Sequence, residues 1–119
     1  MRDKDKICIE KIDMYCKDIM SFCDGISFDE FIANNMIKYS CSFALGQIGD
    51  LVKQISDELK QKYADIPWHK VAGFRNRVIH EYHRVDFDIF WEIVKGNIPE
   101  LLNYTQEILN DIKQQEETQ

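Results

Sequence analysis

Eleven residues in the second half of the chain, Phe74–Arg84, hold most of the side chains that could do chemistry. They include two of the three histidines (His80 and His83), three arginines and a tyrosine. A histidine can take up or release a proton near neutral pH, because its pKa is about 6.5. An arginine keeps its positive charge and holds phosphate with a planar fork of N–H donors. This segment therefore combines acid–base groups with cations that suit a phosphate ligand.

The charge of the whole chain limits where such a ligand could bind. Asp and Glu number 21 against 15 Lys and Arg, which gives a net charge of −6. This balance argues against an extended nucleic-acid surface. Between residues 68 and 84, however, one acid stands against four basic residues: Lys70, Arg75, Arg77 and Arg84. A local basic patch on an acidic body could bind a phosphate chain at one place.

Apolar residues recur at helical spacing along almost the whole chain, which contains only two prolines and five glycines. No alternating strand pattern competes with this spacing. The sequence therefore predicts an all-α fold: an antiparallel bundle of four to five helices in one domain over residues 1–113, with a polar tail at residues 114–119. No apolar run approaches the roughly 18 residues of a membrane span, and no signal-type segment opens the chain. We expect no membrane partner and a cytoplasmic location.

Capping signals set the expected helices of the first half. The first helix should run from about residue 4 to residue 23 and end at Asp24-Gly25, where glycine can take a left-handed conformation. Ser27 and Glu30 form a capping-box signature at the start of the next helix. Its apolar stripe keeps phase to about Lys62. One long helix, with or without a kink, is therefore as consistent with the pattern as two shorter ones.

The second half is divided by its prolines and one of its glycines. Pro67 lies at a restart, so a helix is expected over residues 68–84. Another helix should begin near Phe87. The pair Gly96-Asn97 is expected to interrupt it, and Pro99 to reopen a final helix. The basic segment thus lies on a helix that precedes the last part of the bundle.

The cysteines and histidines are candidate metal ligands by residue type. The four cysteines are Cys8, Cys16, Cys23 and Cys41. No C-x-x-C pair occurs, and the first three share one helical face, so buried reduced thiols are the better account. His80 and His83 are spaced to share a metal, but no third ligand has a suitable spacing. We predict neither a metal nor another cofactor.

Gly46 and Gly49, together with Ser42, make a strip of small residues beside an apolar stripe. A glycine inside a helix costs about 1 kcal/mol relative to alanine, so its presence needs a compensating reason. Two reasons remain open. Either two helices of the monomer cross closely at this strip, or a second subunit approaches it.

If residues 68–84 form one regular helix, its polar face gathers most of the candidate residues: Asn76, Arg77, His80, His83 and Arg84. Arg75 then falls on the opposite, apolar face, where it must find a carboxylate, a carbonyl or a phosphate unless the helix is irregular. Simpler explanations exist for several of these residues. Arg75 could pair with an acid, Arg77 and Arg84 could be solvated charges, and Tyr82 could be packed in the core.

The spacing Arg75-x4-His80-x-Tyr82 resembles the R-x4-H-x-Y motif of the HepT-like branch of the HEPN ribonucleases, the toxin half of HEPN/MNT toxin–antitoxin pairs. The flanking segments are similar to that family in order and spacing, and the resemblance covers most of the chain. These segments are Ile48-Gly49, Ile66-Pro67-Trp68, Arg75-Asn76, Val85-Asp86, Phe90-Trp91 and Ile98-Pro99-Glu100-Leu101. No motif position departs from the family pattern.

The resemblance implies a HEPN-like bundle that acts on RNA as a metal-independent endoribonuclease and as a homodimer with a shared cleft. It also implies a partner, an MNT-type nucleotidyltransferase antitoxin that modifies Tyr82 with AMP. Cleavage of RNA without a metal needs a base for the 2′-hydroxyl, an acid for the leaving oxygen and a cation for the phosphorane. On one regular helix Arg75 and His80 point about 140° apart, so two chains or a broken helix would have to bring them together.

These considerations assign roles to named residues. His80 is expected to act as general acid–base, Arg75 to bind the phosphate and the transition state, Asn76 to support them, and Tyr82 to be the regulatory acceptor. The path of the RNA would be lined by Lys70, Arg77, His83 and Arg84. The rival interpretation is a non-enzymatic helical module that binds RNA, or docks the nucleotidyltransferase, through the same basic patch.

Overall fold

The computed structural model describes the backbone of residues 3–84 and 86–118, and the side chains of these residues except 81–84. Helices make up most of both ranges, and neither contains a strand. The helices are α1 (Asp3–Phe22), α2 (Phe28–Ala33), α3 (Asn35–Gln54), α4 (Asp57–Lys62), α5 (Trp68–Ala72), α6 (Phe74–Arg84), α7 (Asp88–Glu92), the π-helical η1 (Ile93–Asn97) and α8 (Ile98–Glu117). The predicted all-α fold is confirmed.

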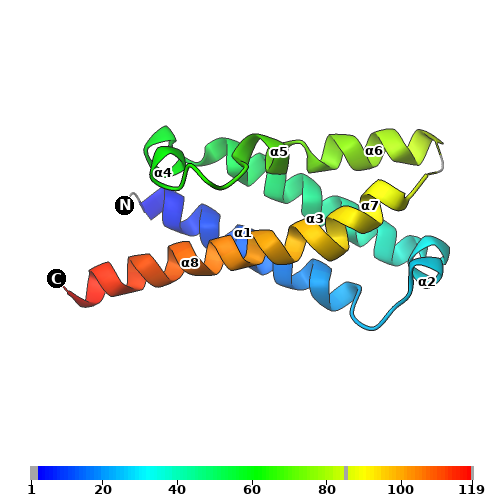
Figure 1. The fold of residues 1–119 in the computed structure, drawn as a ribbon, viewed down its shortest axis with the longest axis horizontal. Coiled ribbons are helices and arrows are strands. Elements are labelled where there is room, and N and C mark those ends of the chain that lie inside the picture. The colour runs from blue at the N-terminus through cyan, green and yellow to red at the C-terminus, as the bar shows by residue number, and fades with distance from the viewer. Residues whose placement is uncertain (1–2, 85, 119) are drawn as a thin grey trace.

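In an elongated bundle that measures 50 × 26 × 20 Å, α1 runs antiparallel to both α3 and α8 (Figure 1). α1 packs against α3 and α8, and α5 and α6 pack along α3. The two ends of the chain lie at the same end of the bundle (Figure 1). The predicted antiparallel helical bundle is therefore confirmed. No described helix combines the length and the apolar character that a membrane crossing requires.

The core of the bundle is built on one face of α1. Ile9, Ile12, Cys16 and Ile19 follow each other at helical spacing and are fully buried. Burying an aliphatic side chain of this size contributes about 1.5–3 kcal/mol, so the apolar face of α1 is a main source of stability. All four cysteines are buried and none forms a disulfide. Their predicted burial is confirmed.

Both predicted features of the loop after α1 are present. Gly25 has a φ of 71°, in the left-handed region that favours glycine. Ser27 and Glu30 form the reciprocal capping box: the Glu30 N–H donates to the Ser27 hydroxyl oxygen at 3.1 Å, and the Ser27 N–H donates to the Glu30 carboxylate at 3.2 Å. These bonds satisfy amide groups at the start of α2 that have no partner within the helix.

The apolar stripe expected to reach Lys62 is carried by three helices, and neither predicted version of it is correct. The breaks lie at capping residues: Asn34 accepts from the Ile37 N–H at the start of α3, and Ser56 accepts from the Leu59 N–H at the start of α4. α3 continues without interruption through both of its glycines. At both junctions a polar side chain lets a new helix begin, because its oxygen accepts a hydrogen bond from a backbone N–H that has no partner within the helix.

Ser56 is in turn held by the first turn of α1. The Asp5 carboxylate is 3% exposed and accepts hydrogen bonds from the Ser56 N–H, at 2.9 Å, and from the Ser56 hydroxyl. A buried carboxylate is tolerated when it is hydrogen-bonded in this way. The beginning of α4 is therefore tied to the beginning of the chain.

The expected interruption at Gly96-Asn97 is wrong. The chain stays helical there, because the π-helical turn η1 joins α7 to α8. The Lys95 ammonium of this turn donates to the Cys23 carbonyl at 2.8 Å and so fixes η1 against the end of α1. At the other end of α8 the helix runs on to Glu117, where an ion pair of 3.2 Å joins Glu116 to Lys6.

Candidate functional site

Residues 68–84 form two helices and not the single helix predicted from the sequence. α5 ends at Ala72 and α6 begins at Phe74. The Gly73 N–H closes α5 by donating to the Lys70 carbonyl at 3.1 Å. α6 then begins a new hydrogen-bond ladder, in which the Gly73 carbonyl accepts from Arg77 at 3.1 Å. The angles expected between residues of α5 and residues of α6 on a continuous helix therefore do not apply, whereas the angles among residues within α6 remain.

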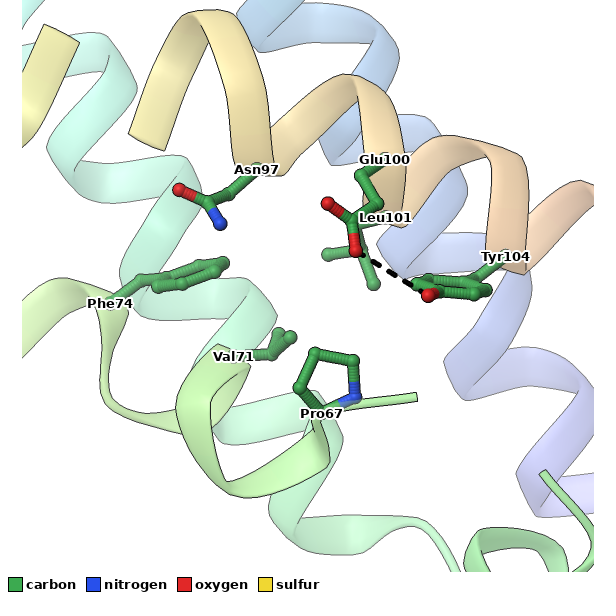
Figure 2. A pocket seen from close by; sticks show the side chains of 7 residues that line it. All are labelled: Pro67, Val71, Phe74, Asn97, Glu100, Leu101 and Tyr104. Carbon is green, nitrogen blue, oxygen red and sulfur yellow. Dashed lines mark hydrogen bonds between the residues drawn. The ribbon is translucent and has the colours of Figure 1, made fainter. Parts of the chain in front are cut away.

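Buried anchors lie on both sides of this break. Val71 and Phe74 are 2% and 1% exposed, and both side chains point toward the start of α8, as Figure 2 shows. Together with Pro67, Asn97 and other residues they line a narrow seam, and the open volume of this seam is about 10 Å³. This is room for one water molecule at most, so the seam is packing and not a ligand site. It holds α5 and α6 in place from the side of α8.

On the other side, α5 and α6 lie against the strip of small residues on α3. A Cβ atom on Gly49 would stand 3.0 Å from the Ala72 carbonyl oxygen, and one on Gly46 would stand 2.9 Å from Arg75 Cδ. At Gly49 the neighbour is a backbone oxygen, so a larger residue would push the two helices apart, whereas at Gly46 the neighbour is a flexible side chain that would have to move. Of the two explanations for this strip, a close crossing inside the monomer is the one that the structure shows.

The predicted position of Arg75 on an apolar face is wrong. Phe74 and Val78 make the buried face of α6, and Arg75 is exposed beside it. The side chain lies over Gly46, with Cγ, Cδ and Nε within 3.8 Å of the Cβ position there. No acid among the described residues forms an ion pair with Arg75. Its charge is therefore available to a ligand, and the simpler explanation of a structural ion pair lacks support.

Three further candidates on α6 are exposed. Asn76 and His80 are four positions apart, so they lie on the same side of the helix one turn from each other, and Arg77 follows Asn76. His80 forms no hydrogen bond with any residue whose side chain is described. Its imidazole is thus open to solvent and to a substrate. No cluster of His, Cys, Asp and Glu that could hold a metal ion occurs among the described residues.

The remaining candidates divide into two groups. Lys70 is an exposed residue of α5, on the turn that precedes the break. Tyr82, His83 and Arg84 belong to the backbone of α6, but their side chains lie outside the described part of the structure. The roles predicted for these three residues therefore stay predictions.

An exposed apolar stripe on α3 was missed in the sequence. Met36, Tyr39 and Phe43 are 77%, 62% and 63% exposed, and Ile79 of α6 is 38% exposed. Tyr39 lies seven residues before Gly46, which places both at nearly the same angle around α3. The stripe therefore leads along α3 toward the crossing with Arg75. The spacing of three and four between its members was the signal that could have revealed it.

Comparisons with known proteins point in one direction. A family model described as "Ribonuclease HepT-like" matches residues 12–108. The chain is 38% identical to "Putative RNase MJ1216" of Methanocaldococcus jannaschii, over 87% of this chain and 85% of that protein. It is 34% identical to "Putative RNase TTE0752" of Caldanaerobacter subterraneus, over 88% and 94%. It is 32% identical to "Probable ribonuclease HepT" of Thermococcus cleftensis, over 85% and 92%. No solved structure gives a significant match.

Proposed function

Because the chain belongs to the HepT-like ribonuclease family, we propose that it is a metal-independent endoribonuclease, the toxin of a HEPN/MNT toxin–antitoxin pair acting on cytoplasmic RNA. One observation carries the proposal: Arg75 and His80 are both exposed on α6 and neither is paired with a described side chain. A charged guanidinium and an accessible imidazole are what phosphodiester cleavage requires.

His80 supplies the proton transfers in this mechanism. Its neutral imidazole removes the proton of a ribose 2′-hydroxyl, whose oxygen attacks the adjacent phosphorus. The bond from phosphorus to the 5′ oxygen breaks, and a protonated imidazole donates a proton to that leaving oxygen. The products are a 2′,3′-cyclic phosphate and a 5′-hydroxyl. Arg75 stabilises the negative charge of the phosphorane with its fork of donors, and Asn76 supports the site from one turn before His80.

We place the site in a cleft shared by two copies of the chain. Arg75 and His80 are five residues apart on the regular helix α6 and point about 140° apart, which is unfavourable for one phosphate bound by one chain. An apolar surface supports a dimer: the stripe of Met36, Tyr39 and Phe43 leads to the same crossing of α3 and α6. Exposed apolar side chains that gather at one place commonly mark a protein interface. A two-fold axis near this stripe would bring two α6 helices together.

Regulation of the enzyme is proposed at Tyr82. A nucleotidyltransferase antitoxin would transfer the AMP group of ATP to the Tyr82 hydroxyl oxygen and release pyrophosphate; Tyr82 lies two residues beyond His80 in the sequence. The added phosphate and base would repel RNA and block its access to the cleft. The motif and its family carry this part of the proposal.

The test is incubation of the purified protein with total RNA in the presence of EDTA. Cleavage should persist in the chelator and should fall by about 10²- to 10⁴-fold in a His80→Ala variant, the range expected for loss of a general acid–base. The Lys11→Gln variant, which changes an exposed residue of α1, is the matched control and should cleave like the wild type. A His80→Ala variant with full activity would overturn the catalytic assignment.

A non-enzymatic RNA-binding or docking module would give a different result. Such a protein would bind RNA or the nucleotidyltransferase but leave total RNA intact under all these conditions. Cleavage that stops in EDTA and returns with a divalent cation would instead indicate a metal enzyme. Each of these outcomes would replace the proposed mechanism.

A further inference from the structure

A groove with a volume of about 520 Å³ lies between α3, α4 and α5. Lys53 at the end of α3, Lys60 of α4, and Trp68 and His69 of α5 line it, and Asn76 of α6 lines it as well. Its volume falls within the range of ordinary ligand sites, about 300–1,000 Å³. None of Lys53, Lys60, Trp68 and His69 has a role in the chemistry proposed above. The groove is therefore a second feature of the molecule that needs a function.

The lysines of this groove have no acidic partner in the part of the chain that the structure describes. Lys53 and Lys60 form no ion pair with any described residue, although the chain carries 21 acids. The ion pairs that do occur in the described structure, Lys6–Glu116 and Lys17–Asp13, lie elsewhere. The lining of the groove includes Lys53, Lys60 and His69 and no Asp or Glu, so it is cationic although the whole chain has a net charge of −6. Cationic side chains of this kind attract the phosphate groups of a nucleic acid.

One wall of the groove is an aromatic ring in a fixed position. The indole of Trp68 is partly exposed, and its N–H donates to the Tyr63 carbonyl at 3.1 Å. A ring that is anchored at one edge loses little conformational entropy when a flat group stacks on it. Stacking of nucleic-acid bases on aromatic side chains contributes about 1–3 kcal/mol per base and does not depend on the base. An amine-lined groove with an aromatic wall suits a single-stranded nucleic acid.

The groove is continuous with the proposed catalytic helix. Asn76 lines the groove and lies on the same side of α6 as His80, one turn earlier. We propose that the groove binds the single-stranded RNA substrate on one side of the scissile phosphate, with Lys53 and Lys60 on backbone phosphates and Trp68 stacked on a base. This inference rests on the proposed ribonuclease function. It adds a site for the part of the strand that does not react.

The test measures the binding of RNA without its cleavage. A single-stranded RNA whose riboses carry 2′-O-methyl groups cannot be cut, and its dissociation constant can be measured by fluorescence anisotropy at several salt concentrations. Lys53→Gln, Lys60→Gln and the double variant are compared with Lys11→Gln on α1. Each groove variant should weaken binding several-fold and lower the slope of log K against log salt by about 0.7, because one phosphate contact is lost. The Lys11→Gln control should match the wild type.

A second readout reports on Trp68 directly. The chain has two tryptophans, so Trp91→Phe leaves Trp68 as the single emitter. RNA should quench its fluorescence, and the quenching should require a higher RNA concentration in the Lys53→Gln/Lys60→Gln variant. A double variant with the wild-type affinity and salt slope would overturn the groove, as would a wild-type chain that does not bind the RNA. Failure of the proposed enzyme is read separately, from the cleavage assays with His80→Ala.

The same variants distinguish two alternative occupants of the groove, a protein partner and double-stranded RNA, when binding to each is measured. If the double variant loses binding to a nucleotidyltransferase partner and keeps its affinity for RNA, the groove is a protein-docking surface and the proposal is wrong. If double-stranded RNA binds more tightly than the single strand and responds to the same substitutions, a stacked base on Trp68 is excluded. Intact folding of each variant is checked by its thermal unfolding midpoint.

Discussion

Arg75 of α6 crosses α3 over Gly46, and its Cδ atom lies 2.9 Å from the position that a Cβ atom of residue 46 would occupy. The arginine that we propose as the phosphate ligand is therefore seated by a glycine on another helix. No acid among the described residues competes for its charge. The geometry of the site depends on α3 as much as on the motif itself.

Substitution of this glycine should damage activity more than stability. In Gly46→Ala the new methyl group must displace the Arg75 side chain, which can rotate away, while alanine adds up to about 1 kcal/mol of helix propensity. We expect the cleavage rate to fall by about 10- to 100-fold, as is typical when a positioning contact is displaced. Cleavage assays and urea unfolding measure the two effects. Wild-type cleavage by Gly46→Ala would show that the seat does not matter.

Gly49→Ala is the matched control for this experiment. Its methyl group would meet the Ala72 carbonyl oxygen at 3.0 Å, and a backbone atom cannot rotate away. The two helices must therefore separate, and we expect a loss of about 1–3 kcal/mol in the free energy of unfolding. Gly46→Ala should therefore lose cleavage rate with little loss of stability, whereas Gly49→Ala should show the larger loss in urea unfolding.

Mixing two inactive variants should restore cleavage if the site is shared between chains. In a dimer of Arg75→Ala with His80→Ala, one cleft would combine the intact arginine of one chain with the intact histidine of the other. Random mixing should recover about a quarter of the wild-type rate, since half of the dimers are mixed and each has one intact cleft. The rate is measured after co-refolding of equal amounts. No recovery would mean that both residues act within one chain.

A charge in the exposed stripe of α3 should prevent dimer formation. Phe43 is 63% exposed in the single chain, and an aspartate there would bury an unpaired carboxylate in a dimer. We expect Phe43→Asp to sediment as a monomer at micromolar concentration and to lose cleavage. Ile7→Asp is the control, because Ile7 is similarly exposed, at 52%, but lies on α1. A dimeric Phe43→Asp protein would place the interface elsewhere.

The stability of the fold should fall in alkaline solution. Burial, with a smaller contribution from the nearby Asp13 carboxylate, raises the pKa of the Cys16 thiol from 9.0 to about 12. The unfolded chain therefore releases this proton from about pH 9, whereas the folded protein keeps it up to about pH 12. The stabilising contribution is complete below pH 9 and is lost as the pH rises toward 12.

Urea unfolding at pH 8 and pH 10.5 tests this linkage. The free energy of unfolding should decrease by no more than about 1.4 kcal/mol per pH unit from one such thiol. Cys16→Val keeps an apolar side chain at the position and removes the titrating group, so its decrease over the same interval should be smaller. Parallel behaviour of the two proteins would assign the pH dependence to other groups.

Local signals in the sequence predicted much of the fold. The capping box of Ser27 and Glu30 and the left-handed Gly25 depend on neighbouring residues only, and both were correct. The breaks at Asn34 and Ser56 were missed, because an apolar stripe can keep its phase across a capped junction. The periodicity of apolar residues indicates which residues are buried, but it does not indicate where the backbone hydrogen bonds of one helix end and those of the next begin.

The candidate site was harder to predict for a physical reason. The exposure of Arg75 follows from how α6 packs on α3: Phe74 and Val78 are buried, and Arg75 lies over Gly46, which comes from a distant part of the chain. The groove likewise combines Lys53 and Lys60 with residues of α5. Contacts of this kind are set by tertiary packing, which no local pattern in one sequence contains.

The two hydrogen bonds from Ser56 to the Asp5 carboxylate connect the first turn of α1 to one wall of the groove that we propose as an RNA-binding site. Ser56 caps α4, and α4 carries Lys60 into the groove, whereas the catalytic candidates lie on α6. A deletion or tag that unwinds the first turn would release α4 and loosen the strand without touching His80. In the proposed arrangement the two lysines of the groove come from α3 and α4 and the catalytic residues from α6, with Asn76 belonging to both, so a change in the first turn of α1 should affect RNA binding more than bond cleavage.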